Sequence, residues 1–149
     1  MAETLGSLCD KLTIVKLKQW HSEEPSRLAS LEVQECQLKN EIDQFTAAAL
    51  SGLVPFENLT FAANKVYKKE GNAIRELEGG LGDVFAQLAE INCKLWHEQE
   101  KVYEFEKVPV EQKDWVVKQL ALLNLERNQC IDQIDKILRA IVENLRGKH

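Results

Sequence analysis

The sequence predicts an all-α fold, an antiparallel four-helix bundle made of two similar αα-hairpins with a short helical or irregular insertion between them. Four long stretches carry apolar residues at three- and four-residue steps, the spacing of an amphipathic helix. Glycine and proline are few, 7 and 3 in 149 residues, and most of them lie between these stretches. We therefore expect a single helical domain over residues 1–149.

An internal repeat supports the pairing of the helices into two hairpins. Residues 5–24 align without gaps with residues 81–100 and are identical at seven of twenty positions. Residues 42–44 match residues 131–133, which links the second predicted helix to the last. The identical pairs of the first alignment are Leu5/Leu81, Gly6/Gly82, Leu12/Leu88, Lys18/Lys94, Trp20/Trp96, His21/His97 and Glu24/Glu100. We interpret the repeat as the trace of two equivalent hairpins that pack face to face.

The first hairpin is expected over residues 4–51. One helix runs from Thr4 to about Ser22, and a second continues to about Leu50. Ser22 is the expected N-cap of the second helix, and Pro25 is tolerated in the first turn that follows it. Gly52 is the expected terminator of this helix. The residues expected to face inward are Leu5, Leu8, Leu12, Ile14, Val15, Leu17, Leu28, Leu31, Leu38, Ile42, Phe45 and Ala49.

The insertion, residues 52–80, has a weaker apolar pattern and most of the glycine. Two short helices are expected in it, Phe56–Lys69 and Asn72–Leu77. Long connections of this kind often carry function, so we expect the segment to be mobile or to act as a lid.

The second hairpin is expected over residues 81–147. A third helix runs from Leu81 to about Lys107, and Pro109 separates it from a last helix at about Val110–Arg146. Apolar residues of the last helix keep a near-heptad spacing, and its Leu- and Ile-rich end at Leu138–Leu145 favours a homodimer.

Composition restricts the function classes. A net charge of −5 and a pI near 5.3 argue against nucleic acid as the main partner, because phosphate binding needs a basic surface. No apolar run has the length of a membrane span, and the N-terminus lacks the features of a secretory signal. We expect a cytoplasmic protein whose four cysteines, Cys9, Cys36, Cys93 and Cys130, are reduced and mostly buried.

Polar residues interrupt the apolar face of the last helix between Leu120 and Ile131. The inward positions there fall on Asn124 or Arg127, with Asn128 beside them. A desolvated arginine needs an acidic or carbonyl partner. The candidate acids are Glu24, Glu98, Glu100 and Asp132. Arg127 is therefore either part of a structural ion pair that fixes helix register or a guanidinium presented to an anionic ligand.

Two histidines allow further interpretations. His21 and His97 are each followed three residues later by a glutamate, Glu24 and Glu100, on the same side of the helix. One interpretation is a divalent metal site made of these four residues, although di-metal bundles use the order Glu-x-x-His. Another is histidines satisfied by carboxylates or carbonyls, and a third is a metal-free polar pocket in which His97 acts as acid, base or ligand contact.

The two tryptophans of the repeat, Trp20 and Trp96, are expected in the core more readily than as platforms for a ligand.

The second half resembles a bacterial helical family of unknown function with the pattern N-x-x-x-L-W-H-x-E-D, then a lysine, then N-x-x-R-N-x-x-I-x-x-I-D. The matching residues here are Asn92, Leu95, Trp96, His97, Lys118, Asn124, Arg127, Asn128, Ile131, Ile134 and Asp135. Residues 9–14 resemble the D-[RK]-L-[ST]-I stretch of the same or a sister family. The chain departs from the pattern at Glu98-Gln99, where the family has two adjacent acids. The resemblance implies no reaction, but it points to cell-envelope polysaccharide metabolism as the pathway, since members are often encoded among genes of that pathway.

The sequence leaves three functions open. The first is a cytoplasmic protein that binds a small anionic ligand or a protein partner in a polar pocket near Trp96, His97, Asn124, Arg127 and Asn128, without a cofactor. The second is a metal-dependent hydrolase that uses inward histidines and glutamates, with His97 as the candidate catalytic residue. The third is a structural module that dimerises through its last helix.

Overall fold

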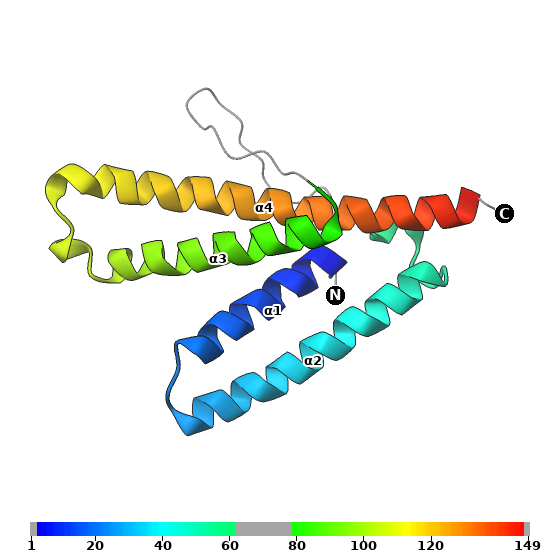
Figure 1. Cartoon of the computed structure of the whole chain (residues 1–149), viewed down its shortest axis with the longest axis horizontal. Helices are drawn as coiled ribbons and strands as arrows, with labels where there is room; N and C mark the ends of the chain where they lie inside the picture. The colour runs from blue at the N-terminus through cyan, green and yellow to red at the C-terminus, as the bar shows by residue number, and fades with distance from the viewer. Residues whose placement is uncertain (1–2, 62–78, 148–149) are drawn as a thin grey trace. The chain divides into compact units, whose positions relative to one another are not determined.

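The computed structural model describes residues 3–61 and 79–147. In these ranges the chain is all-α, as predicted, with four α-helices, two 3₁₀ turns and no strand (Figure 1). The helices are α1 (Leu5–Trp20), α2 (Pro25–Leu50), α3 (Leu81–Tyr103) and α4 (Val110–Gly147), and the turns are η1 (Phe56–Asn58) and η2 (Phe105–Lys107).

The chain divides into two compact units, and the division falls inside α4. Unit 1 contains residues 1–63 and 131–149, and unit 2 contains residues 64–130. The helices expected at Phe56–Lys69 and Asn72–Leu77 lie mostly outside the described residues, as does most of the proposed lid. Where the first of them was expected to begin, the structure has only the short turn η1.

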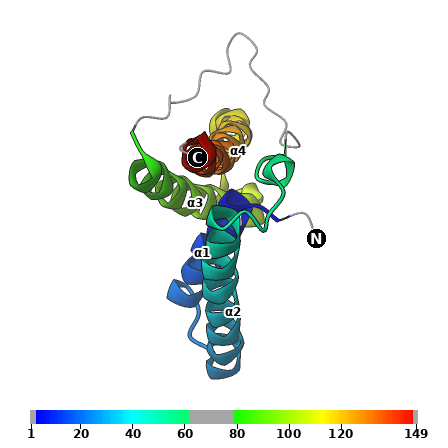
Figure 2. The ribbon, with the colours of Figure 1, turned by 90° about the vertical axis from the view of Figure 1, so that its right-hand side faces the viewer.

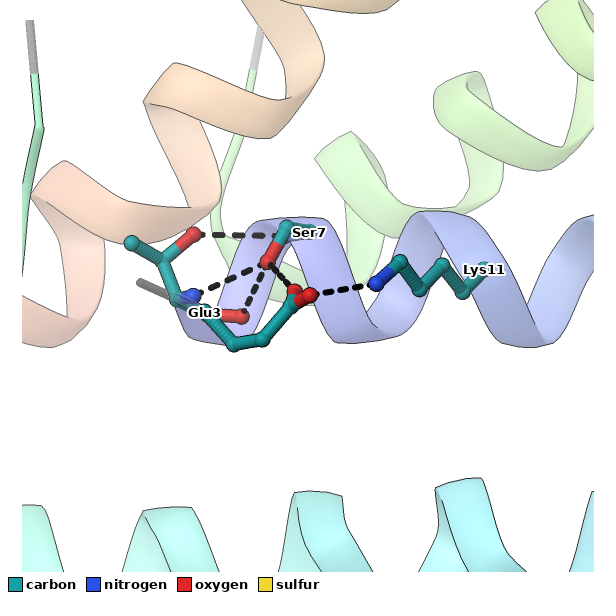
Figure 3. A network of polar contacts seen from close by, with 4 residues as sticks. Glu3, Ser7 and Lys11 are labelled. Atoms are coloured by element: carbon teal, nitrogen blue, oxygen red, sulfur yellow. Dashed lines mark hydrogen bonds and ion pairs between the residues drawn. The ribbon is translucent and has the colours of Figure 1, made fainter. Parts of the chain in front are cut away.

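The start of α1 is capped by side chains. Thr4 is the N-cap, its Oγ1 accepts a hydrogen bond from the Ser7 backbone N–H at 3.3 Å, and the Ser7 hydroxyl accepts one from the Thr4 backbone N–H at 2.9 Å. The Ser7 hydroxyl also donates to Glu3 Oε2 at 2.6 Å, and Lys11 pairs with the other oxygen of Glu3 (Figure 3). This network satisfies backbone donors that a helix start leaves open and places a carboxylate at the positive end of the helix dipole.

The turn between α1 and α2 differs in detail from the prediction. The N-cap of α2 is Glu24 and not Ser22, and Pro25 occupies the first helical position, where its missing N–H costs nothing. His21 ends α1, and its Nδ1 lies 2.8 Å from the Leu17 carbonyl oxygen. The same carbonyl accepts the His21 backbone N–H at 3.1 Å, so the imidazole adds a second contact to the last turn of α1.

The predicted helix terminator Gly52 is confirmed. Its φ of 82° is in the left-handed region, which favours glycine. The Leu53 N–H donates to the Ala48 carbonyl at 2.9 Å, and the Gly52 N–H donates to the Ala49 carbonyl at 3.4 Å. These two hydrogen bonds form a Schellman motif, which ends α2 and directs the chain toward η1.

The α1–α2 hairpin belongs to unit 1, and its helices run antiparallel (Figures 1 and 2). Lys16 Nζ bonds Glu35 Oε1 across the hairpin at 2.6 Å. The twelve residues predicted to face inward are all buried or half-buried, although α2 fully buries only Leu31 and Ala49. The prediction for Trp20 was wrong: this side chain is 86% exposed, because α1 ends there.

The closest approach in unit 1 lies between α1 and the last part of α4. A Cβ added to Gly6 would lie 2.3 Å from the Ile131 carbonyl oxygen and 2.8 Å from Asp135 Oδ1. The Gly6 N–H donates to Asp135 Oδ1 at 2.7 Å, and the whole contact is buried. The absence of a side chain at position 6 therefore allows a carboxylate of α4 to reach the N-terminal turn of α1.

Burial changes the acidity of this carboxylate. Loss of water raises the pKa of Asp135 from 3.8 to about 6, and the like charge of Asp132 acts in the same direction. Hydrogen bonds from Gly6 and Thr4 act against this change but do not cancel it. The same burial, with the negative charges of Asp135 and Asp10, raises the pKa of the Cys9 thiol to about 12.

A second contact in unit 1 joins η1 to the end of α4. The Phe56 ring lies 4.6 Å from Arg139 Cζ and 5.2 Å from Arg146 Cζ, and Arg139 Nη1 donates to the Thr60 hydroxyl at 3.3 Å. Each cation–π contact at an exposed site contributes about 0.5–1 kcal/mol. In water, two like charges repel by roughly 0.4 kcal/mol at about 10 Å and by about 1 kcal/mol at about 4 Å, so the two ring contacts together offset the repulsion. Leu59, fully buried, anchors the segment that carries the ring.

Unit 2 contains an antiparallel hairpin of α3 and the part of α4 up to residue 130 (Figure 1). Gly80 precedes α3, and its N–H donates to Asp83 Oδ2 at 3.1 Å. The helix ends at Tyr103, earlier than the predicted Lys107, because η2 and Pro109 form the turn into α4. Lys113 Nζ lies 4.8 Å from the centroid of the Phe105 ring at this turn.

The two copies of the sequence repeat have different surroundings. Gly6 is packed against α4, whereas a Cβ at Gly82 would meet nothing within 4 Å. Leu5 is 5% exposed and its counterpart Leu81 is 38% exposed. Equivalence of the hairpins therefore stays a prediction.

Replacement of Asp135 by Asn is expected to remove a pH dependence of stability. Because the pKa of Asp135 is raised by folding, its contribution to the free energy of unfolding is fully present below about pH 4. This contribution is lost as the pH rises through about 6. D135N keeps an oxygen for the Gly6 N–H without the buried charge. In urea titrations, the free energy of unfolding of D135N minus that of the wild type should rise by up to about 3 kcal/mol from pH 4 to pH 8.

D135A serves as the control for this experiment. It leaves the Gly6 N–H without its acceptor and should lose about 1–3 kcal/mol at both pH values. Parallel pH profiles of the wild type and D135N would contradict the assignment.

The repeat provides a matched pair of glycine substitutions. G6A places a methyl group against a backbone carbonyl that cannot move aside, so we expect a loss of about 2–3 kcal/mol in free energy of unfolding. G82A introduces a better helix former into open space and should gain about 0.5–1 kcal/mol. Equal effects in thermal or urea unfolding would contradict the close approach at Gly6.

Candidate functional site

The polar face of α4 is the first group of candidate residues. Arg127 and Asn128 follow Asn124 by three and four residues, so each lies on the side of the helix that carries Asn124. Asn124 is exposed, and Arg127 and Asn128 are half-buried. Arg127 is thus less buried than the sequence predicted. The face is therefore exposed to solvent at Asn124 and partly buried at the Arg127 guanidinium.

Trp96 and His97 form the second group, on α3. Trp96 is half-buried and His97 is exposed. The next turn of α3 contains an ion pair between Glu98 Oε1 and Lys101 Nζ at 2.9 Å. Glu98 Oε2 is buried and accepts no hydrogen bond from the described residues.

The two groups lie at different distances along their helices from the turn between α3 and α4. His97 is six positions before Tyr103 at the end of α3, and Arg127 is seventeen positions after Val110 at the start of α4. At a rise of 1.5 Å per residue, these separations correspond to about 9 Å and about 26 Å of helix. A single pocket that joins all five residues stays a prediction.

A hollow of about 540 Å³ borders the first turns of α3. Ala86 lies seventeen positions before the end of α3, and Arg127 lies seventeen positions after the start of α4. Both acids of the hollow have partners: Asp83 accepts the Gly80 N–H, and Glu90 lies 3.2 Å from Lys94 Nζ. The described residues that line the hollow are Gly79, Asp83, Ala86, Gln87 and Glu90.

A smaller groove of about 270 Å³, which the sequence reasoning missed, lies at the turn between α3 and α4. Trp115 is 63% exposed beside it, and Val116 on the next position is buried. The signal that points to it is a tryptophan soon after Pro109 in a charged segment. Its lining consists of Lys101, Glu104, Lys107, Val108, Pro109, Gln112, Trp115 and Val116.

The residues of the metal alternative lie on both units. His21 and Glu24 belong to the α1–α2 turn in unit 1, where His21 contacts the Leu17 carbonyl and Glu24 accepts a hydrogen bond from the Ser26 hydroxyl at 2.6 Å. His97 and Glu100 belong to α3 in unit 2. Within residues 3–61 and 79–147, no group of three or more His, Cys, Asp or Glu side chains is gathered as a metal site would require.

The four cysteines divide into two kinds. Cys9 and Cys130 are buried, whereas Cys36 and Cys93 are exposed, so the prediction of mostly buried thiols holds for half of them. None of the four forms a disulfide. With a pKa of about 12, Cys9 stays a neutral thiol at physiological pH and is a poor nucleophile.

Comparisons of the chain with protein-family models, curated proteins and solved structures each returned no match. In the described part of the chain, no helix combines the length and apolar composition that a membrane span requires.

Proposed function

We propose that the chain binds a small anionic ligand through the polar face of α4 formed by Asn124, Arg127 and Asn128. The observation that carries the proposal is a half-buried guanidinium with a carboxamide before and after it on the same face. Arginine stays charged at every physiological pH, and its planar fork binds carboxylate or phosphate oxygens in pairs. The two carboxamides add N–H donors at fixed positions.

The charges around Arg127 support an anion as the ligand. The positions one turn before and after it on α4 are Leu123, Asn124, Cys130 and Ile131, none of which is acidic. A guanidinium that is partly desolvated binds an anion more strongly than one in bulk water, because the local dielectric constant is lower.

The position of His97 limits its part in this function. Counted along the two helices from the turn between them, Arg127 lies roughly 16 Å farther than His97. We therefore assign ligand binding to the α4 face and treat Trp96 and His97 as contacts for a longer ligand only. The metal-dependent hydrolase is not the function we favour, because no observation on the described residues brings its four residues together.

The resemblance to the bacterial family supplies the proposed setting. It extends over Asn124, Arg127, Asn128 and Asp135, which include the whole proposed binding face. We propose on this basis a cytoplasmic role in cell-envelope polysaccharide metabolism, where phosphorylated and carboxylated sugars are the common anions.

Replacement of Arg127 by Met tests the proposal directly. If the guanidinium faces a ligand, R127M should keep its free energy of unfolding within about 1 kcal/mol and lose the rise in melting temperature that citrate and inorganic phosphate produce at constant ionic strength. A structural ion pair would instead cost about 3–5 kcal/mol when broken.

Arg27 of α2 provides the matched control, since it is an exposed arginine in the other unit. R27M should leave both melting temperature and anion response unchanged. A large loss of stability in R127M with an unchanged anion response would refute the proposal and support the structural role.

Dimerisation is the second candidate function, and one observation favours it. Ile141 and Leu145 lie one turn apart on α4 and are 40% and 44% exposed, next to the buried Leu138 and Val142. Apolar side chains repeated on adjacent turns of a long helix are typical of a helix–helix contact.

Lysine substitutions at this position test the dimer. Sedimentation of the wild type should show a mass near twice 17.0 kDa at micromolar concentration, and the double variant I141K/L145K should sediment as a monomer. V117K, at a 56% exposed valine of unit 2, should not change the mass. A monomeric wild type at 100 µM would exclude this function.

A further inference from the structure

We propose that Arg139 and Arg146 of α4, held on the Phe56 ring, form a phosphate-binding site in unit 1, separate from the polar face at Arg127. The site lies in unit 1 as a whole, because residues 1–63 and 131–149 belong to that unit. It needs no residue of the α3–α4 hairpin and so does not depend on the proposed function.

The first step of the argument is the position of the two charges. Arg139 and Arg146 are seven residues apart, close to two helical turns, so they leave α4 on the same side. Their Cζ atoms lie 4.6 and 5.2 Å from the centroid of one ring, which brings the guanidinium groups within about 10 Å of each other. Two exposed side chains that would otherwise diverge are thereby directed to one place.

The second step is the number of donors left for a ligand. A contact with the face of a ring uses no N–H group, and a guanidinium has five of them. Arg139 uses one, from Nη1 to the Thr60 hydroxyl at 3.3 Å. Neither Arg139 nor Arg146 forms an ion pair with a carboxylate of the described residues. The two side chains therefore present most of their donors and two uncompensated positive charges.

The third step is the contrast with the other cations. Lys11, Lys16, Lys94, Lys101 and Lys107 each pair with a glutamate within 4.0 Å. Arg139 and Arg146 instead share one aromatic ring and have no such partner among the described residues, in a chain whose net charge is −5. Glu143 lies between them in sequence, one turn from each, and is the natural competitor for an anion.

The charge and shape of the ligand follow from this arrangement. Two forked donors held on one ring match a tetrahedral oxyanion with several oxygens and two negative charges. A phosphate monoester has this chemistry, and inorganic phosphate shares it. A single carboxylate can use only one of the two forks fully.

The segment that carries the ring is fixed well enough to serve as the base of a site. The Schellman motif at Gly52 sets the direction of the chain after α2, and Leu59, with no exposed surface, anchors it a few residues later. Phe56 lies between these two fixed points and is half-buried. The ring therefore orients both guanidinium groups before any ligand arrives, which reduces the entropy cost of binding.

The experiment is a titration of the full chain with inorganic phosphate at constant ionic strength, followed by the NMR signals of the arginine Nε–Hε groups. The signals of Arg139 and Arg146 should move together and saturate with one dissociation constant. R139M and R146M, which keep the aliphatic contact with the ring, should each weaken binding by about 10-fold or more. F56L, which keeps both charges but removes the ring, should weaken it several-fold.

Two controls make the result decisive. R27M removes an exposed arginine from α2 and should not change the dissociation constant, whereas E143Q removes the competing carboxylate and should strengthen binding. The Nε–Hε signal of Arg127 reports separately on the other proposed site, so failure of one proposal is distinguishable from failure of the other. A linear response shared equally by Arg27, or unchanged binding in both R139M and R146M with native circular dichroism, would overturn the assignment.

Discussion

The buried contact between Gly6 and Asp135 is the constraint on which unit 1 depends. It joins the first turn of α1 to the second half of α4 across 129 positions of sequence. A carboxylate at the N-terminus of a helix is favourable because it accepts a backbone N–H and complements the helix dipole, but burial of its charge is costly. The raised pKa of Asp135 shows that burial is the stronger effect. The arrangement is therefore best explained as a geometric requirement of close helix packing, which only a glycine at position 6 permits.

The α4 helix connects the structural and the proposed functional features. Its 38 residues carry the polar face at Arg127 in unit 2, the buried Asp135 in unit 1, and the two arginines over Phe56 near its end. A helix of this length has sides that face different neighbours along its course, which is why its apolar pattern is interrupted more than once. Interruption by a polar residue thus has two meanings here: at Asp135 it marks a helix contact, and at Arg127 we infer a ligand contact.

Charge is distributed unevenly in this acidic chain. Three of the six described ion pairs are links within one helix, such as Lys94 with Glu90 and Lys101 with Glu98, and pairs of this kind contribute only about 0.3–0.5 kcal/mol each. They do neutralise lysines locally. Arg139 and Arg146 instead contact an aromatic ring, which holds a guanidinium in place without neutralising it. An overall negative charge is therefore compatible with anion binding at particular places.

Periodicity and local chemistry determined the helical class, the helix bounds to within a few residues, the inward faces of α1 and α2, and the end of α2 at Gly52. These features depend on interactions between residues close in sequence, through the 3.6-residue repeat and the conformational freedom of glycine. Tertiary structure alone decided that Trp20 lies in solvent and that Gly6 and Gly82 have different surroundings. It also decided that Phe56 lies against Arg139 and Arg146. These properties depend on the level and rotation of one helix against another, which one-dimensional spacing does not contain.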